Sequence, residues 1–470
     1  MKIRTIVATL FAALLSTTLS AQDVAQEQVA QQEPTQTEEV DSKKSKKKKK
    51  EVQYNEHGEI IKTGYNFGPL PVVAFDADKG FQLGALLNIY NFGDGSTYPN
   101  PMSHWYFEAS FFTKGSQLFV VSYDDKKLIP GVRWSTAVTL TNEKALDFYG
   151  FNGYASPYFG PSFGHLDGEK SEFYWMRRNQ FRLVTSVQRR IVGNLHWAAG
   201  LGYYNIVTGN VNLEGYNGQN TLYQMYRNAG LIRDNEAHGG NVLQLKAGLV
   251  YDTRDHDSDP TRGVNIEATL VGAPDIIDRK GYSNLGFTFV GSQYVPVWKD
   301  KLTFAYRLGI QTKLAGEIPY YFINNLNTLF FRKVYTEGLG GNASVRGINR
   351  NGVVGNGMAW LNTEFRWRIV NFRFINQNFH IALNPFFDMG QVIQPYRLEE
   401  QKAAFELLDG KFNQDNPFYS GNEEALHATA GCGLKIVMNR NFVISVEMAR
   451  ALDNRDGQKL WNNIGFNYLF

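Results

Sequence analysis

The segment Gly340–Asn351 reads GGNASVRGINRN and includes Arg346, a charged residue that an inert hairpin turn does not need. The strand-like segment that follows, Ala359–Ile369, alternates apolar and polar side chains, and Glu364 falls on its polar face. The next strand-like segment alternates in the same way and places Asp388 on its polar face. The sequence therefore predicts two carboxylates that point into one polar interior, close in the chain to an arginine-bearing loop.

No motif of a hydrolase, a phosphate-binding loop or a cysteine metal site is present in the chain. Two histidines, His380 and His427, fall on the inward faces of their strands by parity. A lipase active site in the wall would need a serine beside one of them, and we keep that as an alternative to ordinary polar interior residues. We expect no enzymatic activity, no cofactor and no metal.

A second polar group lies between two strand-like segments and reads D-T-R-D, followed by proline and glycine. Asp257 and Asp259 extend it, so the cluster could suggest a calcium loop. No glutamate follows at the spacing of a calcium loop, and the proline marks a tight turn, so the sequence predicts a turn. The residues of this motif are Asp252, Thr253, Arg254, Asp255, Pro260 and Gly263.

From Leu70 onward, alternating segments follow one another at lengths near the roughly 9 to 11 residues with which a tilted strand crosses a bilayer. Their number, about sixteen, is even. We therefore predict an all-β fold, a sixteen-stranded antiparallel transmembrane β-barrel. The expected strands are Leu70–Asp76, Phe81–Tyr90, His104–Thr113, Gln117–Asp125, Val132–Thr141, Phe173–Arg189, Asn194–Ile206, Asn241–Asp252, Gly263–Val271, Tyr282–Val297, Lys301–Thr312, Ala359–Val370, Phe379–Gly390, Ala425–Met438, Phe442–Arg450 and Lys459–Phe470.

The gaps between these strands are sorted by length. The four long gaps, at 142–172, 207–240, 313–358 and 391–424, all follow odd-numbered strands, and short gaps follow even-numbered ones. Outer-membrane barrels have short periplasmic turns and long extracellular loops, so this order indicates a chain that starts in the periplasm. A soluble β-sandwich has no reason to sort its loops in this way.

Composition agrees with an exported barrel. The chain has 470 residues, 14% aromatic residues, 45 glycines, one cysteine and a formal net charge of +3. Residues 1–21 combine basic residues, an apolar run and small residues, which predicts a cleaved signal peptide. No later run is long and apolar enough for a transmembrane helix, so a spanning chain must form a closed barrel. We expect residues 65–470 to form it in an outer membrane.

Residues 22–64 lack apolar periodicity and contain the run Lys43–Lys50, which reads KKSKKKKK. The like charges of such a segment repel one another, and it has no apolar surface to offset the entropy cost of ordering. We therefore expect a disordered periplasmic tail. An unspecific solvated tether is the favoured reading of the lysine run. The alternative is a docking segment for an acidic partner or for anionic lipid head groups.

The two ends of the expected barrel differ. In the last strand, Phe466, Tyr468 and Phe470 share one face with Ile464, and Asn463, Gly465 and Asn467 share the other. The first strand contains Pro69 and Pro71, which lack backbone donors. Few hydrogen bonds can then form where the first and last strands meet, so the sequence predicts a weak seam.

The arginine loop and the strand pair after it resemble those of the BamA/TamA-like superfamily of outer-membrane barrels. The V-R-G-aromatic motif of that family has isoleucine here in the aromatic position, and the family's F-x-D-x-G strand motif is complete. The D-T-R-D turn and the terminal phenylalanine, which is similar to an outer-membrane assembly signal, also match. The motif residues are Val345, Arg346, Gly347 and Ile348 in the loop and Phe386, Asp388 and Gly390 in the strand.

The resemblance implies a fold detail and a function. The loop between strands eleven and twelve would fold into the lumen, where Arg346 would pair with Glu364 and Asp388. About 45 tail residues are too few for a POTRA domain, so the chain resembles a POTRA-less member. We therefore expect an accessory subunit in outer-membrane protein assembly or insertion. The alternative is a transport pore or secretion channel plugged by its lumen loop. Expected partners are outer-membrane lipids, lipopolysaccharide and other envelope proteins, and no nucleic acid.

Overall fold

The computed structural model describes residues 53–55, 58–76, 80–160, 172–211, 221–326, 338–342, 344–407, 417–457, 459–466 and 468–470. The predicted signal peptide and most of the predicted tail, including the lysine run, lie outside these residues. Within them, no helix has both the length and the apolar character needed to cross a membrane.

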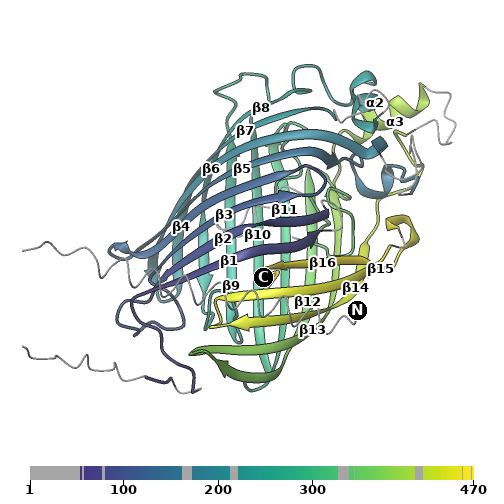
Figure 1. Cartoon of the computed structure of the whole chain (residues 1–470). Coiled ribbons are helices and arrows are strands. Elements are labelled where there is room, and N and C mark those ends of the chain that lie inside the picture. Colours follow the sequence, from purple (N-terminus) through teal and green to yellow (C-terminus); the bar gives the residue numbers. More distant parts are fainter. Residues whose placement is uncertain are drawn as a thin grey trace, which may run out of the picture.

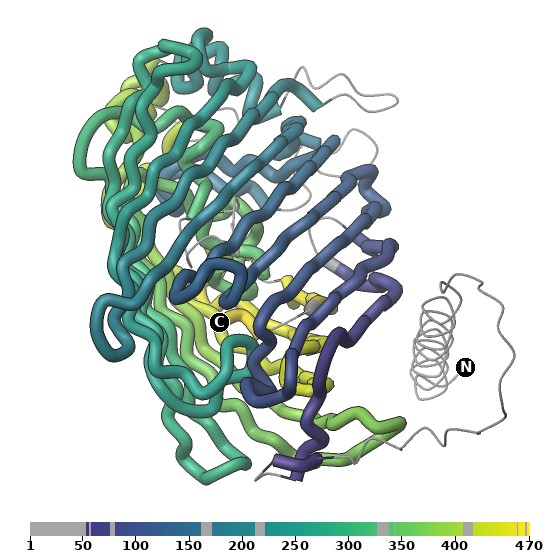
Figure 2. Tube along the Cα trace, turned by 90° about the vertical axis from the view of Figure 1, so that its left-hand side faces the viewer, coloured from purple at the N-terminus to yellow at the C-terminus, as the bar shows by residue number. Residues whose placement is uncertain are grey.

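Sixteen antiparallel strands pair in sequence order and close on themselves, as predicted (Figure 1). Seen from the end where the tight turns lie, the strands surround a single lumen (Figure 2). Their bounds are β1 Tyr65–Asp76, β2 Gly80–Asn91, β3 Ser103–Phe112, β4 Gln117–Ile129, β5 Val132–Asp147, β6 Trp175–Val192, β7 Leu195–Asn210, β8 Gly239–Asp252, β9 Gly263–Ala273, β10 Asn284–Trp298, β11 Leu302–Gly316, β12 Gly357–Phe374, β13 Gln377–Gln394, β14 His427–Met438, β15 Phe442–Ala451 and β16 Trp461–Phe466.

The alternation predicted from the sequence appears in the burial of the strands. On β6, Arg178, Gln180 and Arg182 are buried inside, whereas Leu183, the next residue along the strand, is 41% exposed on the outer surface. A soluble core has the opposite polarity, because its apolar side chains are the buried ones. Polar residues inside and apolar residues outside are the pattern of a barrel whose surroundings are lipid.

The long loops follow β5, β7, β11 and β13 and lie together at one end of the barrel (Figure 1). Two of them contain short helices, α2 Leu222–Asn228 and α3 Leu398–Glu406, where the sequence reading expected only strands and turns. Both segments were too short and too weakly periodic to stand out as helices. Thr221 caps α2 by accepting a hydrogen bond from the backbone of Gln224.

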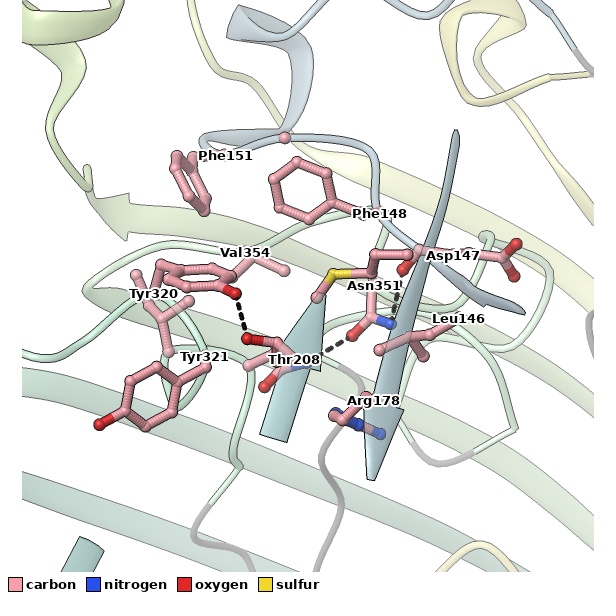
Figure 3. Close-up of a pocket in the computed structure, with 14 residues that line it drawn as sticks. Leu146, Asp147, Phe148, Phe151, Arg178, Thr208, Tyr320, Tyr321, Asn351 and Val354 are labelled. Carbon is pink, nitrogen blue, oxygen red and sulfur yellow. Dashed lines mark hydrogen bonds between the residues drawn. The ribbon is translucent and has the colours of Figure 1, made fainter. Parts of the chain in front are cut away.

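Aromatic side chains from the four long loops meet in one buried cluster, which we call the aromatic cap. A cavity of about 30 Å³ lies beneath it, with room for only one or two waters (Figure 3). There the Tyr320 hydroxyl donates to Thr208 over 2.5 Å. Because the loops come from opposite sides of the barrel, the cap ties these walls together. Its aromatic members include Phe148, Phe151, Tyr174, Tyr223, Tyr226, Tyr320, Tyr396 and Phe418.

The barrel closes through a weak seam, as predicted. β1 pairs with β2 along all twelve of its residues, but with β16 only at Phe75 opposite Ile464 and Asp76 opposite Asn463. Both pairs lie beyond the two prolines of β1. The rest of the edge of β1 has no strand partner in the described chain, and Val72 instead packs near Phe442 of β15.

The last residues correct the sequence reading. β16 ends at Phe466, although the last strand was expected to run to Phe470, and Tyr468 and Phe470 are only 3% and 8% exposed inside the barrel. Arg366 donates to the carbonyl oxygen of Phe470 over 2.6 Å, and Arg307 donates to that of Leu469 over 3.4 Å. The reason is physical: the prolines of β1 remove donors from the wall, whereas the lumen supplies two guanidinium donors.

The residues just before β1 contact the far side of the seam. Asn378 of β13 accepts a hydrogen bond from the backbone N–H of Ile60 over 3.1 Å and donates to its carbonyl over 3.2 Å. Lys62 donates to the carbonyl of Asn376 in the β12–β13 turn. Residues 60–62 are therefore held against the barrel, although the sequence reading placed them in a disordered tail.

Candidate functional site

Residues 338–356, which precede β12, form a compact structure that we call the lumen loop. Leu339 and Val353 pair across its base. The Ser344 hydroxyl accepts from the N–H of Gly340 over 2.9 Å and so fixes the turn that leads to the arginine. Val345 and Ile348 are 1% and 2% exposed and belong to one apolar cluster. Isoleucine is thus well packed at the position where the resembling family has an aromatic residue.

The structure brings Arg346 together with both carboxylates named from the sequence. Its Nε and Nη2 atoms donate to the two oxygens of Asp388 over 2.7 and 2.9 Å, and its backbone N–H donates to the same carboxylate over 3.1 Å. Nη1 donates to Glu364 over 3.2 Å. The Arg346 side chain has no solvent exposure. A fork-shaped donor is thus matched by a bidentate acceptor in a dry site.

Two other motif residues shape this site. The ring of Phe386 lies 3.6 Å from the guanidinium carbon of Arg346, which places the cation over an aromatic face. At Gly390, a Cβ atom would come within 2.8 Å of Leu339 and 3.0 Å of Val345. A larger residue there would push the lumen loop off the wall. Gly347 has a φ of +99°, which favours glycine after the arginine.

Three further charged residues belong to the cluster. Parity placed Arg366 on the inward face, but none of the three was predicted as a partner. Glu447 of β15 accepts from Arg346 over 3.0 Å and from Lys435 of β14 over 2.6 Å, and Arg366 of β12 donates to Glu364 over 2.6 Å. The six side chains comprise three cations and three carboxylates, so the buried charge balances. No sequence motif marks Lys435 and Glu447. The alternation of side chains along β14 and β15 was the one feature of the sequence that could have shown that they point into the lumen.

A second arginine ties the lumen loop to the opposite wall. Arg350 donates to Glu143 of β5 over 2.8 Å, and Glu143 also binds Arg178 of β6 at 2.6 Å. In the closed order of sixteen strands, β5 and β13 are eight strands apart. Because Arg346 binds β13 and Arg350 binds β5, the loop crosses the lumen from one wall to the other.

The predicted turn motif joins β8 to β9 at the end with the tight turns. The Thr253 hydroxyl accepts from the N–H of Val264 over 2.9 Å, and Arg254 binds Asp252 at 2.7 Å. Gly263 has a φ of +102°, and a Cβ atom there would lie 2.3 Å from the carbonyl oxygen of Thr253. The motif residues therefore specify how the turn is closed.

The three aspartates of this turn bind basic residues from other parts of the barrel. Pro260 is buried beside them. In the described part of the chain, no group of three or more acidic, histidine or cysteine side chains is arranged to hold a metal ion. The turn is thus an electrostatic brace across the short-turn end. Its ion pairs are Asp255 with Arg440 at 2.9 Å, Asp257 with Lys126 at 2.8 Å and Arg133 at 3.1 Å, and Asp259 with Arg368 at 2.7 Å.

His256 lies at the centre of the brace and is 1% exposed. Its Nδ1 accepts from the backbone N–H groups of Ser258 and Asp259 over 3.1 and 2.9 Å, an arrangement that requires an unprotonated Nδ1. Burial and the neighbouring Arg440 lower the pKa of His256 from 6.5 to about 4. The imidazole is therefore neutral at physiological pH.

The two histidines considered for a lipase site have structural contacts. His427 Nδ1 is 2.6 Å from Asp456, and its ring stacks on that of Tyr154, with the ring centres 3.9 Å apart. His380 Nε2 lies 3.7 Å from Asp259. Neither ring is hydrogen-bonded to a serine hydroxyl within the residues that the structure describes. Both histidines thus lie beside carboxylates, and neither contact supplies the nucleophile that a lipase needs.

Comparison with known proteins gives a family match. Residues 103–468 match the model of the Omp85 superfamily domain. Among solved structures, the chain is similar to BamA from Haemophilus ducreyi lacking POTRA domains 1–3, with 16% identity and a TM-score of 0.51 over 86% of this chain and 70% of that one. CdiB from Escherichia coli has 12% identity and a TM-score of 0.49, over 89% and 67%. A search of curated protein sequences finds no match.

Proposed function

Since this chain belongs to the Omp85 superfamily, we propose that its barrel serves in the outer membrane as an accessory subunit in the assembly or insertion of membrane proteins, without enzymatic activity. The observation that carries the proposal is the seam, where only two residue pairs join β1 to β16. Its partners would be outer-membrane lipids, lipopolysaccharide and other envelope proteins.

An unpaired strand edge offers backbone groups to an incoming strand. Pro69 and Pro71 are paired with β2 and have no N–H, so their free positions face away from β2, toward the seam. The middle of the edge then offers carbonyl acceptors without the matching donors. An incoming strand would pair there incompletely, which suits a transient contact and not a permanent one.

The filled lumen supports this role over that of an open pore. The aromatic cap covers the long-loop end, the lumen loop crosses the interior, and the β8–β9 turn braces the other end. Barrels of sixteen to eighteen strands leave an aqueous channel when nothing fills them. A transport pore would require these segments to move together.

Locking the seam tests the proposal. In a Cys432→Ser background, Phe75→Cys and Ile464→Cys place two thiols at directly opposed positions of β1 and β16. Under oxidation we expect the amount of folded outer-membrane protein in cells that depend on this variant to fall, and reduction to restore it. The matched control is Ala85→Cys with Ala109→Cys, an opposed pair in the continuous β2–β3 ladder.

Equal activity of the oxidised seam variant and the oxidised control would contradict a role for the seam. The accessory role has a separate readout, affinity purification of the native protein followed by mass spectrometry of its companions. We expect components of an outer-membrane assembly complex among them. A protein recovered without such components, but with full seam-dependent activity, would act alone and not as an accessory subunit.

A further inference from the structure

The two rims of the barrel differ in exposed charge. In the four hairpins from β4 to β11, the described residues of the tight turns and of the strand ends beside them include six exposed bases but only one exposed acid, Asp300. The described residues of the long-loop rim, by contrast, include five exposed acids, Asp234, Glu399, Glu400, Glu406 and Glu423, mixed with bases. We call the six bases of the hairpins the basic arc. They are Lys127, Arg189, Arg190, Arg262, Lys299 and Lys301.

The basic arc lies where a membrane surface is expected. Arg189 is in register with Trp197, and both are on the exposed side of the wall. The Lys301 ammonium lies 4.3 Å from the ring centre of Trp298, which is 57% exposed. Tryptophan prefers the level of lipid head groups, and long basic side chains extend toward that level. The arc is therefore at the edge of the apolar belt.

The arc stops on both sides of the seam. In the β2–β3 loop, the exposed charged residue is Asp94, an acid. In the β14–β15 turn, Arg440 is only 9% exposed and is engaged by Asp255 and Asp259. The two turns that flank the seam thus present no exposed base. The nearest other bases on this rim, Arg373 and Lys62, donate to the backbone carbonyl groups of Gly58 and Asn376.

We propose that the basic arc binds anionic phospholipid head groups of the periplasmic leaflet and so anchors the wall away from the seam. Basic side chains near an anionic surface each change partitioning by about fivefold, and the attraction decays within about 10 Å at ordinary ionic strength. A charged surface confined to one sector would hold lipid there and leave the seam sector free. The inference depends on the barrel's spanning an outer membrane, and it is independent of the assembly role.

Tryptophan quenching by brominated lipids measures this preference. The wild-type barrel is reconstituted in zwitterionic phosphatidylcholine that contains brominated phosphatidylglycerol, or brominated phosphatidylcholine in its place, and the relative lipid-binding constant is obtained. The arc variant combines Arg189→Gln, Arg190→Gln, Lys299→Gln and Lys301→Gln. The control combines Lys114→Gln, Lys144→Gln, Arg279→Gln and Lys459→Gln, which removes the same four charges from the long-loop rim.

We expect the wild type and the control to prefer the anionic lipid by about fivefold, the arc variant to show a ratio near one, and salt to lower the wild-type ratio. Equal binding of the anionic and the zwitterionic lipid by the wild type would overturn the proposal. An acidic protein would then be the remaining candidate partner of the basic arc. An equal loss in the control would also overturn it, because the effect would then follow net charge. If the arc variant does not fold, judged by its heat-modifiable gel mobility, the wild-type salt series decides.

Discussion

Arg346 determines the geometry of the lumen loop because one guanidinium satisfies three carboxylates from β12, β13 and β15. The arginine and two of these carboxylates could be inferred from the sequence. The alternation of side chains along the strands predicted that Glu364 and Asp388 point inward. The family motif identified Arg346 as their partner. Glu447 could not be paired in advance, since β15 is separated from the loop by about a hundred residues and parity alone does not say which strands face each other.

We expect Arg346→Lys to destabilise the barrel by about 2 kcal/mol, although it keeps the charge. A lysine ammonium cannot donate two parallel hydrogen bonds to Asp388, so acceptors of the buried cluster lose their partner. Urea unfolding in detergent, followed by tryptophan fluorescence, would measure the change. Arg262→Lys, at an exposed arginine of the β8–β9 turn, is the matched control and should leave the midpoint in place. Equal urea midpoints for the two variants would show that the paired hydrogen bonds from Arg346 to Asp388 are not needed for stability.

At the scale of elements, regular strands were predictable and their interruptions were not. Alternation fixed which face of each strand is apolar, and gap lengths fixed which loops share an end. The inward path of Tyr468–Phe470 was missed because alternation continues through these residues. Strand parity places Arg307 and Arg366 in the lumen but does not show that they bind the end of the chain. The β8–β9 turn was recognised as a turn, but its ion pairs with β4, β12 and the β14–β15 turn depend on barrel closure.

That turn makes stability depend on pH through His256. Its pKa is lowered from 6.5 to about 4 in the folded protein, so the unfolded chain takes up a proton first as the pH falls. The contribution of His256 to the free energy of unfolding is complete above pH 6.5 and is lost as the pH falls toward 4. About 2 kcal/mol of it is lost at pH 5. Asp259, whose pKa is lowered to about 2, loses its contribution only below 3.8, outside this range.

The test compares unfolding of the wild type and of His256→Asn between pH 8 and pH 5. An asparagine oxygen can accept from the backbone N–H groups of Ser258 and Asp259 but does not titrate. We therefore expect the variant to lose less stability on acidification than the wild type, whatever its starting value at pH 8. Parallel pH profiles for the two proteins would mean that His256 is not the group responsible.

For the molecule as a whole, closure of the lumen has three layers that differ in construction. The aromatic cap is held by apolar packing, the lumen loop by fully buried ion pairs to opposite walls, and the β8–β9 brace by partly exposed ion pairs. Partly exposed pairs are weakened by salt more than fully buried ones. The layers therefore do not open under one common condition, and removal of one leaves the other two in place.

Single-channel recording in planar bilayers separates the assembly role from the pore. We expect the wild type to show no steady conductance. Deletion of residues 342–351 removes both Arg346 and Arg350, and hence the crossing of the lumen, but leaves the cap and the brace. An assembly protein closed by the remaining layers should then conduct little, whereas a pore plugged by the loop alone should show steady openings. Steady conductance that appears on deletion, with unchanged folding of other outer-membrane proteins in cells, would favour the pore.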